Sequence, residues 1–404
     1  MDTGRTPHLT ARLQGIGTTI FTEVSALALR SGAVNLGQGF PDFDPPADLA
    51  DAARRAIADG HNQYAPGPGI PTLRAAVAGH ATRHFGLSYD PDHEVTVTTG
   101  ATEAMFATIQ ALVDVGDEVV LFEPAYDVYP AAVAMAGGRA RGVPLGPDAD
   151  GVWRFDPEAL RRAVGPRTRA IVLNSPHNPC GKVYDRDELE VIADVATAAD
   201  VVVITDEVYE HLVYGDAVHV PIASLPGMHQ RTVRISSAGK TFSVTGWKVG
   251  WVCAPAPLTQ AIRAAKQWVT FTSGTPFQHA VADALTWGET YTAPLATSFA
   301  ARAARLSGAL ADLGFAVHRT DGTYFVTVDV RPLGFADDVD FCARLPLEVG
   351  VAAIPVSVFF DDPADGRGYV RFAFCKTDEL LDVGIARLQD RLHGMSRSLP
   401  PGRT

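Results

Sequence analysis

The chain has 404 residues, is 47% hydrophobic and carries a formal net charge of −12, with 34 Lys and Arg against 46 Asp and Glu. This length exceeds a typical single domain, and the acidic balance argues against binding to nucleic acid or to anionic membranes. The four scattered cysteines suggest neither a disulfide framework nor a zinc site. With no secretion signal and no apolar run of roughly 18 residues, we expect a cytoplasmic protein.

The first part of the chain reads as an arm followed by a helix and a loop. A short helix is expected over Thr19–Arg30, and the glycines and proline of Val34–Phe43 end it. Leucine, alanine and isoleucine recur at helical spacing over Leu49–Asp59. The alternating prolines and glycines of Tyr64–Pro71 predict an extended loop.

The middle of the chain alternates short apolar runs with longer amphipathic segments. The apolar runs are β-branched and continuous, which is typical of strands covered on both faces. These predicted strands are Val95–Thr99, Glu118–Phe122, Ala170–Leu173, Val201–Thr205, Val233–Ser236 and Gly250–Cys253. The helices expected between them are Thr102–Val113, Asp156–Val164 and Asp185–Ala198. The alternation predicts an α/β fold with a large, mostly parallel central sheet flanked by helices.

The pattern changes after Trp287 and predicts a smaller α+β unit. Its expected helices are Ala296–Leu313, a segment near Asp337–Leu345, and Thr377–Leu392. Its expected strands are Phe315–His318, Thr323–Asp329, Val349–Ile354 and Gly368–Phe374. We therefore divide the chain into an arm that joins the small domain (1–46), a large domain (47–287), a C-terminal small domain (288–395) and a disordered tail (396–404).

Chemistry is expected just after the strands, because ligands of a parallel sheet bind beyond its carboxyl ends. The small residues Gly100, Ala101 and Thr102 open a helix, where backbone N–H groups can meet a phosphate. Asn178 follows another strand in a rigid, proline-rich loop. Taken alone, each of these signals is more often an ordinary turn or a helix cap.

Two further strand ends carry charged residues. Asp206 and Tyr209 follow one strand, and a buried carboxylate is costly unless it is paired. Lys240 follows the next strand among small residues, and Lys248 adds a second cation. A lone lysine is usually a solvated surface charge, but here several signals converge on one edge of the sheet.

These residues resemble the hallmark segments of the class I/II aminotransferases, which are fold-type I pyridoxal-phosphate enzymes. The segment Ser236-Ser-Ala-Gly-Lys240-Thr-Phe242 is similar to the family's cofactor-attachment motif. The segments Asn178-Pro-Cys-Gly181 and Asp206-Glu-Val-Tyr209 resemble two other hallmarks, in the family's chain order. The resemblance extends from Asn35–Phe43 to Tyr369–Lys376 and is nearest to the branch of kynurenine, methionine and actinobacterial N-succinyldiaminopimelate aminotransferases.

The resemblance implies a role for each cofactor residue. Lys240 would hold pyridoxal phosphate as a Schiff base and shuttle the proton at the substrate Cα. Asp206 would keep the pyridine nitrogen protonated, and Tyr209 and Asn178 would hydrogen-bond the cofactor's phenolic oxygen. Tyr126 would stack on the ring.

The phosphate and substrate groups follow from the same resemblance. Gly100, Ala101 and Thr102 would hold the phosphate together with Ser236 and Lys248. Arg371 would bind the substrate α-carboxylate, with Gly37 approaching it through the backbone and Phe21 lining the pocket. Tyr64 would reach the phosphate of a partner subunit, so the resemblance implies a homodimer with shared sites.

The predicted reaction is transfer of the α-amino group of an amino acid to a 2-oxo acid by a ping-pong cycle. The alternative on the same cofactor is β-elimination of cysteine conjugates. A cofactor-sensing regulator is a remote alternative, because such proteins add a DNA-binding domain and this chain is acidic. A nicotinamide-dependent dehydrogenase is rejected, since no G-x-G-x-x-G motif follows a first strand. The sequence leaves the donor open among methionine, kynurenine, glutamate, N-succinyldiaminopimelate and others.

Overall fold

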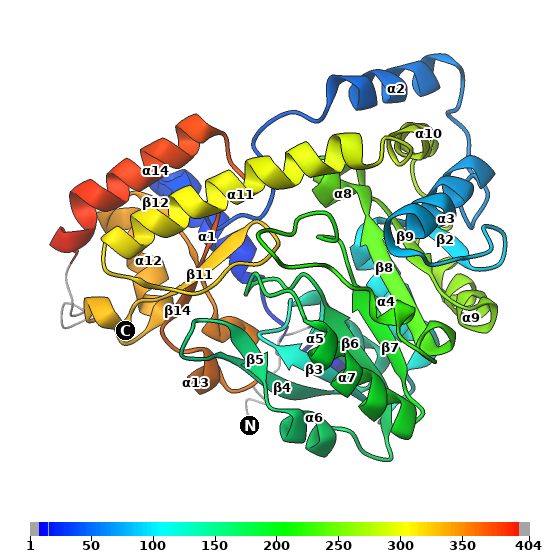
Figure 1. Ribbon diagram of the computed structural model, residues 1–404, viewed down its shortest axis with the longest axis horizontal. Helices are drawn as coiled ribbons and strands as arrows, with labels where there is room; N and C mark the ends of the chain where they lie inside the picture. Colours follow the sequence, from blue (N-terminus) through cyan, green and yellow to red (C-terminus); the bar gives the residue numbers. More distant parts are fainter. Residues whose placement is uncertain (1–7, 15, 396–404) are drawn as a thin grey trace.

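A computed structural model describes residues 8–14 and 16–395 of the chain. The predicted disordered tail, 396–404, lies outside the described residues, as do residues 1–7 and 15. Two sheet systems lie side by side, with the smaller one on the left in Figure 1. Within the described ranges, no helix is both long enough and apolar enough to cross a membrane.

The larger sheet has eight strands among the described residues, in the order β2-β9-β8-β7-β6-β3-β4-β5. They are β2 (Val95–Thr99), β3 (Glu118–Glu123), β4 (Arg139–Pro147), β5 (Trp153–Phe155), β6 (Thr168–Asn174), β7 (Val202–Asp206), β8 (Thr232–Ser237) and β9 (Val249–Cys253). Only β9 and β5 in this sheet run against the other strands. The predicted large, mostly parallel sheet is confirmed.

Helices cover both faces of the larger sheet (Figure 1). Side chains alternate along a strand, so Val119 and Leu121 of β3 pack on one face while Val120 and Phe122 pack on the other. The first face carries α4 (Gly100–Leu112), α5 (Val128–Ala136) and α9 (Ala256–Lys266), and the second carries α6 (Pro157–Ala163) and α7 (Arg186–Ala198). At the β2–β9 edge lie α2 (Ala47–Ala58), α3 (Pro71–Phe85), α8 (Ala238–Thr241) and α10 (Thr275–Ala284).

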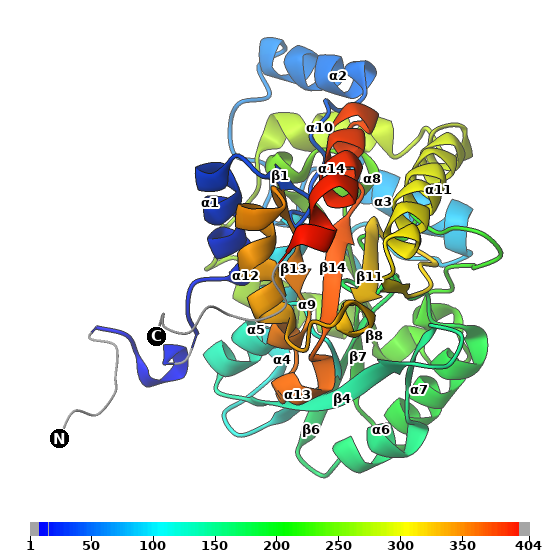
Figure 2. The same ribbon diagram turned by 90° about the vertical axis from the view of Figure 1, so that its left-hand side faces the viewer.

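The smaller system joins the N-terminal arm to the C-terminal part of the chain. Its strands are β1 (Val34–Asn35), β10 (Ala316–Val317), β11 (Phe325–Asp329), β12 (Val351–Ala352), β13 (Ile354–Pro355) and β14 (Tyr369–Ala373). β1 pairs with β12, and the others form a sheet in the order β10-β11-β14-β13. Around them lie α1 (Ile20–Ser31), α11 (Glu289–Asp312), α12 (Asp338–Glu348), α13 (Pro363–Gly366) and α14 (Asp378–Arg391). Figure 2 shows α1, α12 and α14 grouped about β13 and β14.

Most predicted elements appear within a few residues of their expected bounds. The caps explain two of these boundaries, since Asp156 and Asp185 each accept hydrogen bonds from the first turn of the helix that follows. Short 3-10 helices complete the described chain at Ala11–Leu13, Ile222–Ser224, His229–Arg231, Thr245–Trp247, Arg331–Leu333, Ser357–Phe359 and Leu392–Gly394. The α-helices and strands that the sequence reading missed in the described chain are α3, α5, α8, α9, α10, α13, β1, β4 and β5.

Candidate active site

A cleft of about 1170 Å³ opens where the strands of the larger sheet end. The last residues of β3, β6, β7 and β8 all line it, namely Glu123, Asn174, Asp206 and Ser237. The arm closes another side with Gln38 and Gly39, and the smaller sheet contributes Phe325 and Arg371. The cleft therefore lies at the carboxyl edge of the parallel strands, as the sequence predicts.

Lys240 lies on the short helix α8, directly after β8, and its side chain enters the cleft. Its Nζ donates to the backbone oxygen of Gly39 at 3.3 Å. The same Nζ lies 5.7 Å from the ring centroid of Tyr209 and 5.5 Å from that of Tyr324. Burial lowers the pKa of Lys240 to about 8. About a tenth of this amine is therefore neutral, and hence nucleophilic, at pH 7.

Asp206 is a buried carboxylate at the end of β7. Its Oδ2 accepts a 2.8 Å hydrogen bond from the Tyr129 hydroxyl, and its Oδ1 accepts one of 3.3 Å from the backbone N–H of Val208. Burial raises the pKa of Asp206, and these two donors oppose that rise. No salt bridge to Asp206 occurs among the described residues, so the carboxylate is available to a cationic ligand group.

The first turn of α4 forms an anion site beside Lys248. An ideal Cβ on Gly250 would lie 2.6 Å from the carbonyl carbon of Gly100, so glycine there lets β9 approach this turn closely. Gly100 itself has a φ of +75°, and the Lys248 Nζ lies about where its Cβ would point, 3.0 Å away. Gly100, Ala101, Thr102 and Lys248 all line the cleft. A helix N-terminus with an adjacent ammonium group favours a phosphate.

The structure corrects the prediction for Ser236. Its hydroxyl donates to Oε1 of Glu210 at 2.9 Å, away from the cleft, and Ser236 is not among the lining residues. Ser237 lines the cleft in its place. The strand continues to Ser237, one residue further than predicted, and successive side chains of a strand point to opposite faces.

Arg371 of β14 is almost fully buried, at 1% exposure. Its guanidinium donates to Oδ1 of Asn178 at 2.8 Å and to the backbone oxygen of Gly37 at 2.6 Å. The guanidinium carbon lies 4.0 Å from the ring centroid of Phe325 and 5.1 Å from that of Phe21. Burial lowers the pKa of Arg371 to about 10, and its Nε has no hydrogen-bond partner among the described residues.

No carboxylate of the described chain pairs with Arg371, although a buried cation is costly without one. The guanidinium faces the cleft that also holds Lys240. Its planar fork matches a carboxylate in two parallel hydrogen bonds. The arrangement can therefore bind the carboxylate of a substrate whose reacting centre lies near the Lys240 amine.

Two other predicted residues lie differently from expectation. The Gly37 N–H donates to Oδ1 of Asn35 at 3.0 Å, so Gly37 holds the Arg371 guanidinium through its carbonyl and does not line the cleft. Tyr64 is 85% exposed and lies outside the cleft, with its ring edge against Phe271. The part of the Tyr64 prediction that involves a partner subunit stays a prediction.

The remaining predicted residues line the cleft together. Phe21 and Tyr126 place their ring centroids 6.0 Å apart, and Asn178, Asp206 and Tyr209 line the same cavity. Sequence reading missed Tyr129, Ser237 and the backbone of Gly39, which accepts from both Lys240 and Tyr324. The spacing of Tyr126 and Tyr129, three residues apart after β3, was the available signal for Tyr129.

These groups fit pyridoxal phosphate on chemical grounds. The cleft offers an anion site at α4, an unpaired buried carboxylate for a basic ring nitrogen and a lysine amine for a carbonyl. The side chains of Tyr126 and Val208 add apolar surface to the lining of the cleft. Each polar group of the cofactor therefore has a counterpart of opposite character in this cleft.

Comparison with known proteins agrees with this chemistry. The model of the family Aminotransferase class I and II matches residues 31–388. A Mycobacterium tuberculosis protein named "Probable N-succinyldiaminopimelate aminotransferase DapC" is 54% identical over 387 residues, covering 94% of this chain and 97% of its own length. The Escherichia coli methionine aminotransferase is 40% identical over 379 residues, covering 94% of this chain and 97% of its own.

A solved structure supports the same assignment. The N-succinyldiaminopimelate aminotransferase from Mycobacterium tuberculosis superposes with a TM-score of 0.92 at 54% identity, covering 94% of this chain and 99% of that one. The family match, the shared fold and the chemistry of the cleft agree. The chain belongs to the class I and II aminotransferases, and it is an enzyme that uses pyridoxal phosphate to transfer amino groups.

Proposed function

We propose that the enzyme moves the α-amino group of an amino acid with an extended, uncharged or largely apolar side chain to a 2-oxo acid. The single observation that carries the assignment of amino acids and 2-oxo acids as substrates is the buried Arg371 guanidinium, which faces the cleft without a carboxylate partner. It would bind the α-carboxylate common to amino acids and 2-oxo acids. Both substrates can then use one site in turn, as a ping-pong cycle requires.

Pyridoxal phosphate supplies the carbonyl that accepts the amino group and a ring that withdraws electrons from the substrate. The Lys240 amine would attach the cofactor and, once released, move a proton to and from the substrate Cα. Asp206 would hold the proton on the ring nitrogen. Ser237, Lys248 and the first turn of α4 would bind the phosphate.

The charges of the cleft favour the proposed side-chain class. The cations that line it in the described chain are Lys240, Lys248 and Arg371, and each has a role above. No lining cation of this chain remains for a short side-chain carboxylate such as that of aspartate. Apolar and aromatic side chains also line the cleft, among them Phe21, Tyr126 and Phe359. An extended donor without a charged side chain, such as methionine or kynurenine, which the relatives' names mention, fits this lining. N-succinyldiaminopimelate, which another relative's name mentions, carries two further carboxylates and would need a cation that this lining does not supply.

We further propose a homodimer that acts in the cytoplasm. Tyr64, Phe271 and Trp268 are large aromatic side chains with 85%, 51% and 85% exposure, and such a surface suits a second copy of the chain. Tyr64 would reach the partner's phosphate site.

All four cysteines are buried and free, as is usual in a reducing compartment. We also propose the domain division at residues 46 and 287, and the separation of the larger and smaller sheets supports it.

Mixing two defective variants would test the shared site. If Tyr64 serves the partner, a dimer of one Tyr64→Phe chain and one Lys240→Ala chain contains one intact site. Statistical mixing at equal amounts would then restore up to about a quarter of the wild-type sites. If no activity returns although an affinity tag on one variant co-purifies the other variant, Tyr64 does not act across the interface.

An absorbance spectrum of the holoenzyme tests the proposed reaction and its donor. Methionine, kynurenine, N-succinyldiaminopimelate, glutamate and aspartate would each be added without an acceptor. Loss of the cofactor's yellow colour with methionine or kynurenine, at lower concentrations than with aspartate, would support the proposal. A response to aspartate alone would overturn the proposed donor class. Release of a thiol and pyruvate from a cysteine conjugate, with no intact 2-oxo acid, would indicate β-elimination.

A further inference from the structure

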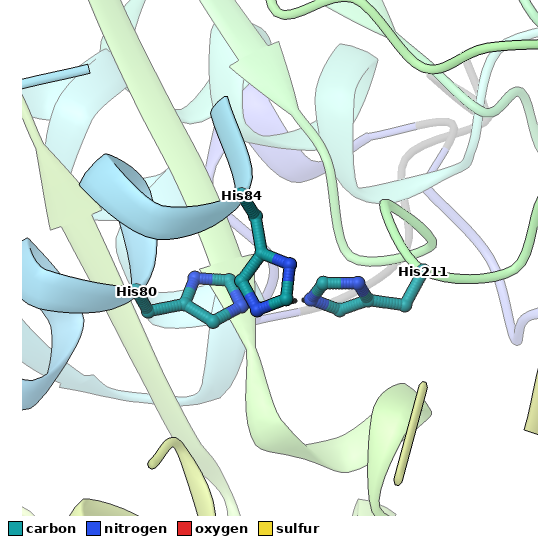
Figure 3. A group of neighbouring side chains, drawn as sticks. All are labelled: His80, His84 and His211. Atoms are coloured by element: carbon teal, nitrogen blue, oxygen red, sulfur yellow. Dashed lines mark hydrogen bonds between the residues drawn. The ribbon is translucent and has the colours of Figure 1, made fainter. Parts of the chain in front are cut away.

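Three histidines meet outside the active-site cleft, between α3 and the segment that follows β7. His80 and His84 lie one turn apart on α3, and His211 lies in the segment that follows β7. One ring nitrogen from each residue lies within 4.8 Å of the others. Figure 3 shows the imidazoles of α3 pointing toward the His211 imidazole, which comes from the opposite side. None of the three lines the active-site cleft.

The spacing of these nitrogens is close to that of metal ligands. The Nε2 atoms of His80 and His211 are 2.7 Å apart. Zinc–nitrogen bonds of 2.0–2.1 Å in a tetrahedral site place two ligand nitrogens roughly 3.3 Å apart. Small rotations of the two rings would open the gap by about half an ångström. The His84 ring already lies beside both, with ring-centroid distances of 4.7 Å to His80 and 4.8 Å to His211.

The ring nitrogens have few competing partners. His80 is 3% exposed, and its Nδ1 is buried without a hydrogen-bond partner in the described chain. The Nε2 atoms of His80 and His211 form a hydrogen bond with each other, and the described residues form no hydrogen bond to the His84 ring. A metal ion would take the place of the hydrogen bond between His80 and His211 and would give the His84 ring a partner within the described chain.

A small cavity adjoins the cluster. It has a volume of about 10 Å³ and is lined by the three histidines together with residues of α8, α10 and α11. A space of this size is about that of one water molecule. The cavity could thus hold a solvent molecule next to an ion bound by the three rings.

The neighbouring group of Glu207, Glu210 and His219 provides a contrast. Its ligand atoms are also close together, but the Arg234 guanidinium donates to both carboxylates and neutralises them. That group is a buried ion-pair network. Its two carboxylates also offset the charge of Arg234, which would otherwise repel a cation from the histidines.

We propose that His80, His84 and His211 bind one zinc ion, with a solvent molecule as its fourth ligand. The ion would tie α3 to the segment after β7 as a structural cross-link. His211 follows Tyr209 by two residues, so the cross-link would restrain the chain that carries Asp206 and Tyr209. Three protein ligands and a water complete the four-coordinate geometry that zinc prefers.

Zinc binding to the purified holoenzyme tests this proposal, with zinc chloride as the probe. After dialysis against metal-free buffer, titration calorimetry and elemental analysis would measure affinity and stoichiometry for wild type, His84→Gln, His211→Gln and His279→Gln. His279 is the matched control, because its ring stacks on His61 at 3.8 Å and forms the other close histidine pair. Cobalt absorbance would report the coordination geometry.

We expect one equivalent of zinc in wild type and in His279→Gln. His84→Gln and His211→Gln should bind at least about a hundredfold more weakly, since loss of even an outer-shell partner costs 10–100-fold. Zinc should raise the melting temperature of wild type but not of His84→Gln. If His211→Gln fails to fold, the partly exposed His84 still provides the test. Absence of zinc binding at micromolar concentrations, equal binding by His84→Gln, or loss of binding only in His279→Gln would overturn the proposal.

Discussion

The Tyr129 hydroxyl donates a 2.8 Å hydrogen bond to Oδ2 of Asp206 inside the protein. Tyr129 comes from α5 and Asp206 from the end of β7, so the bond links two separate elements in the wall of the cleft. Hydrogen bonding to the charged form of a carboxylate lowers its pKa and opposes the effect of burial. Tyr129 thus helps to keep ionised the carboxylate that we expect to face the cofactor's ring nitrogen.

Replacement of Tyr129 by phenylalanine should therefore raise the pKa of Asp206 and weaken its hold on a protonated ring nitrogen. A hydrogen bond to a charged group contributes about 1.5–3 kcal/mol, so we expect kcat to fall by about tenfold or more. Steady-state kinetics with a good donor would measure this. Tyr214→Phe is a matched control, because the Tyr214 hydroxyl is also buried but donates to the backbone oxygen of Thr323 outside the cleft. Equal losses in both variants would contradict the role of Tyr129.

Replacement of Arg371 by glutamine should weaken binding of the amino acid more than binding of the cofactor. Truncating one partner of a buried charge pair costs about 2–5 kcal/mol, so the dissociation constant of the donor should rise by at least about 30-fold. Titration of the holoenzyme's absorbance would measure it. Arg331→Gln removes a half-exposed arginine of the smaller unit that is paired with Asp329, and it should leave donor binding unchanged. Unaltered donor affinity in Arg371→Gln would exclude the proposed carboxylate site.

Alanine substitution of the two neighbouring serines of β8 should affect different properties, cofactor affinity at Ser237 and stability at Ser236. Ser237→Ala should raise the dissociation constant of pyridoxal phosphate by several-fold, because Ser237 lines the cleft beside the anion site. Ser236→Ala should leave that constant unchanged and lower the free energy of unfolding by about 1–3 kcal/mol, because a buried oxygen of Glu210 loses its donor. Fluorescence titration and urea unfolding would separate the two. The reverse pattern would restore the original assignment of Ser236.

The lowered pKa of Lys240, about 8, predicts how capture of the cofactor depends on pH. Only the neutral amine attacks a carbonyl, and the neutral fraction grows tenfold per pH unit below the pKa and levels off above it. The rate constant for capture of pyridoxal phosphate by cofactor-depleted enzyme should thus rise up to about pH 8 and then flatten. For a free lysine amine, with a pKa near 10.4, the same rate constant should keep rising to about pH 10. Stopped-flow absorbance would measure the rate constant at each pH. If the rate constant of the enzyme also keeps rising to about pH 10, the result contradicts the burial of Lys240.

Some features of this fold are readable from sequence because their cause is local. The Asp185–Glu188 capping box and the β-branched runs of the central strands are signals within a few residues. The helix α5, Val128–Ala136, was missed because its residues are almost all apolar and include Pro130, which hides any helical period. The strand β4 was missed because its first four residues are exposed.

The site residues, too, divide into those whose position follows from the local sequence and those whose position depends on the tertiary structure. The strand-end positions of Asp206 and Lys240 follow from the order of elements, and the resemblance to the aminotransferases assigns their roles. Ser236 was misassigned because β8 was expected to end there. The strand continues to Ser237, and neighbouring side chains of a strand point to opposite faces. The role of Gly37 depends on a hydrogen bond from Arg371, which lies far along the chain and which only the tertiary structure brings near.

The most direct test of the account is multiple-turnover transamination by wild-type and Lys240→Ala enzyme, each loaded with pyridoxal phosphate. An extended donor and a 2-oxo acid would be supplied in excess, and both products would be counted against the number of sites. The account predicts many turnovers and equal amounts of new amino acid and new 2-oxo acid in wild type, with less than one turnover in Lys240→Ala. Turnover by Lys240→Ala at the wild-type rate, or none by wild type with any donor, would contradict it.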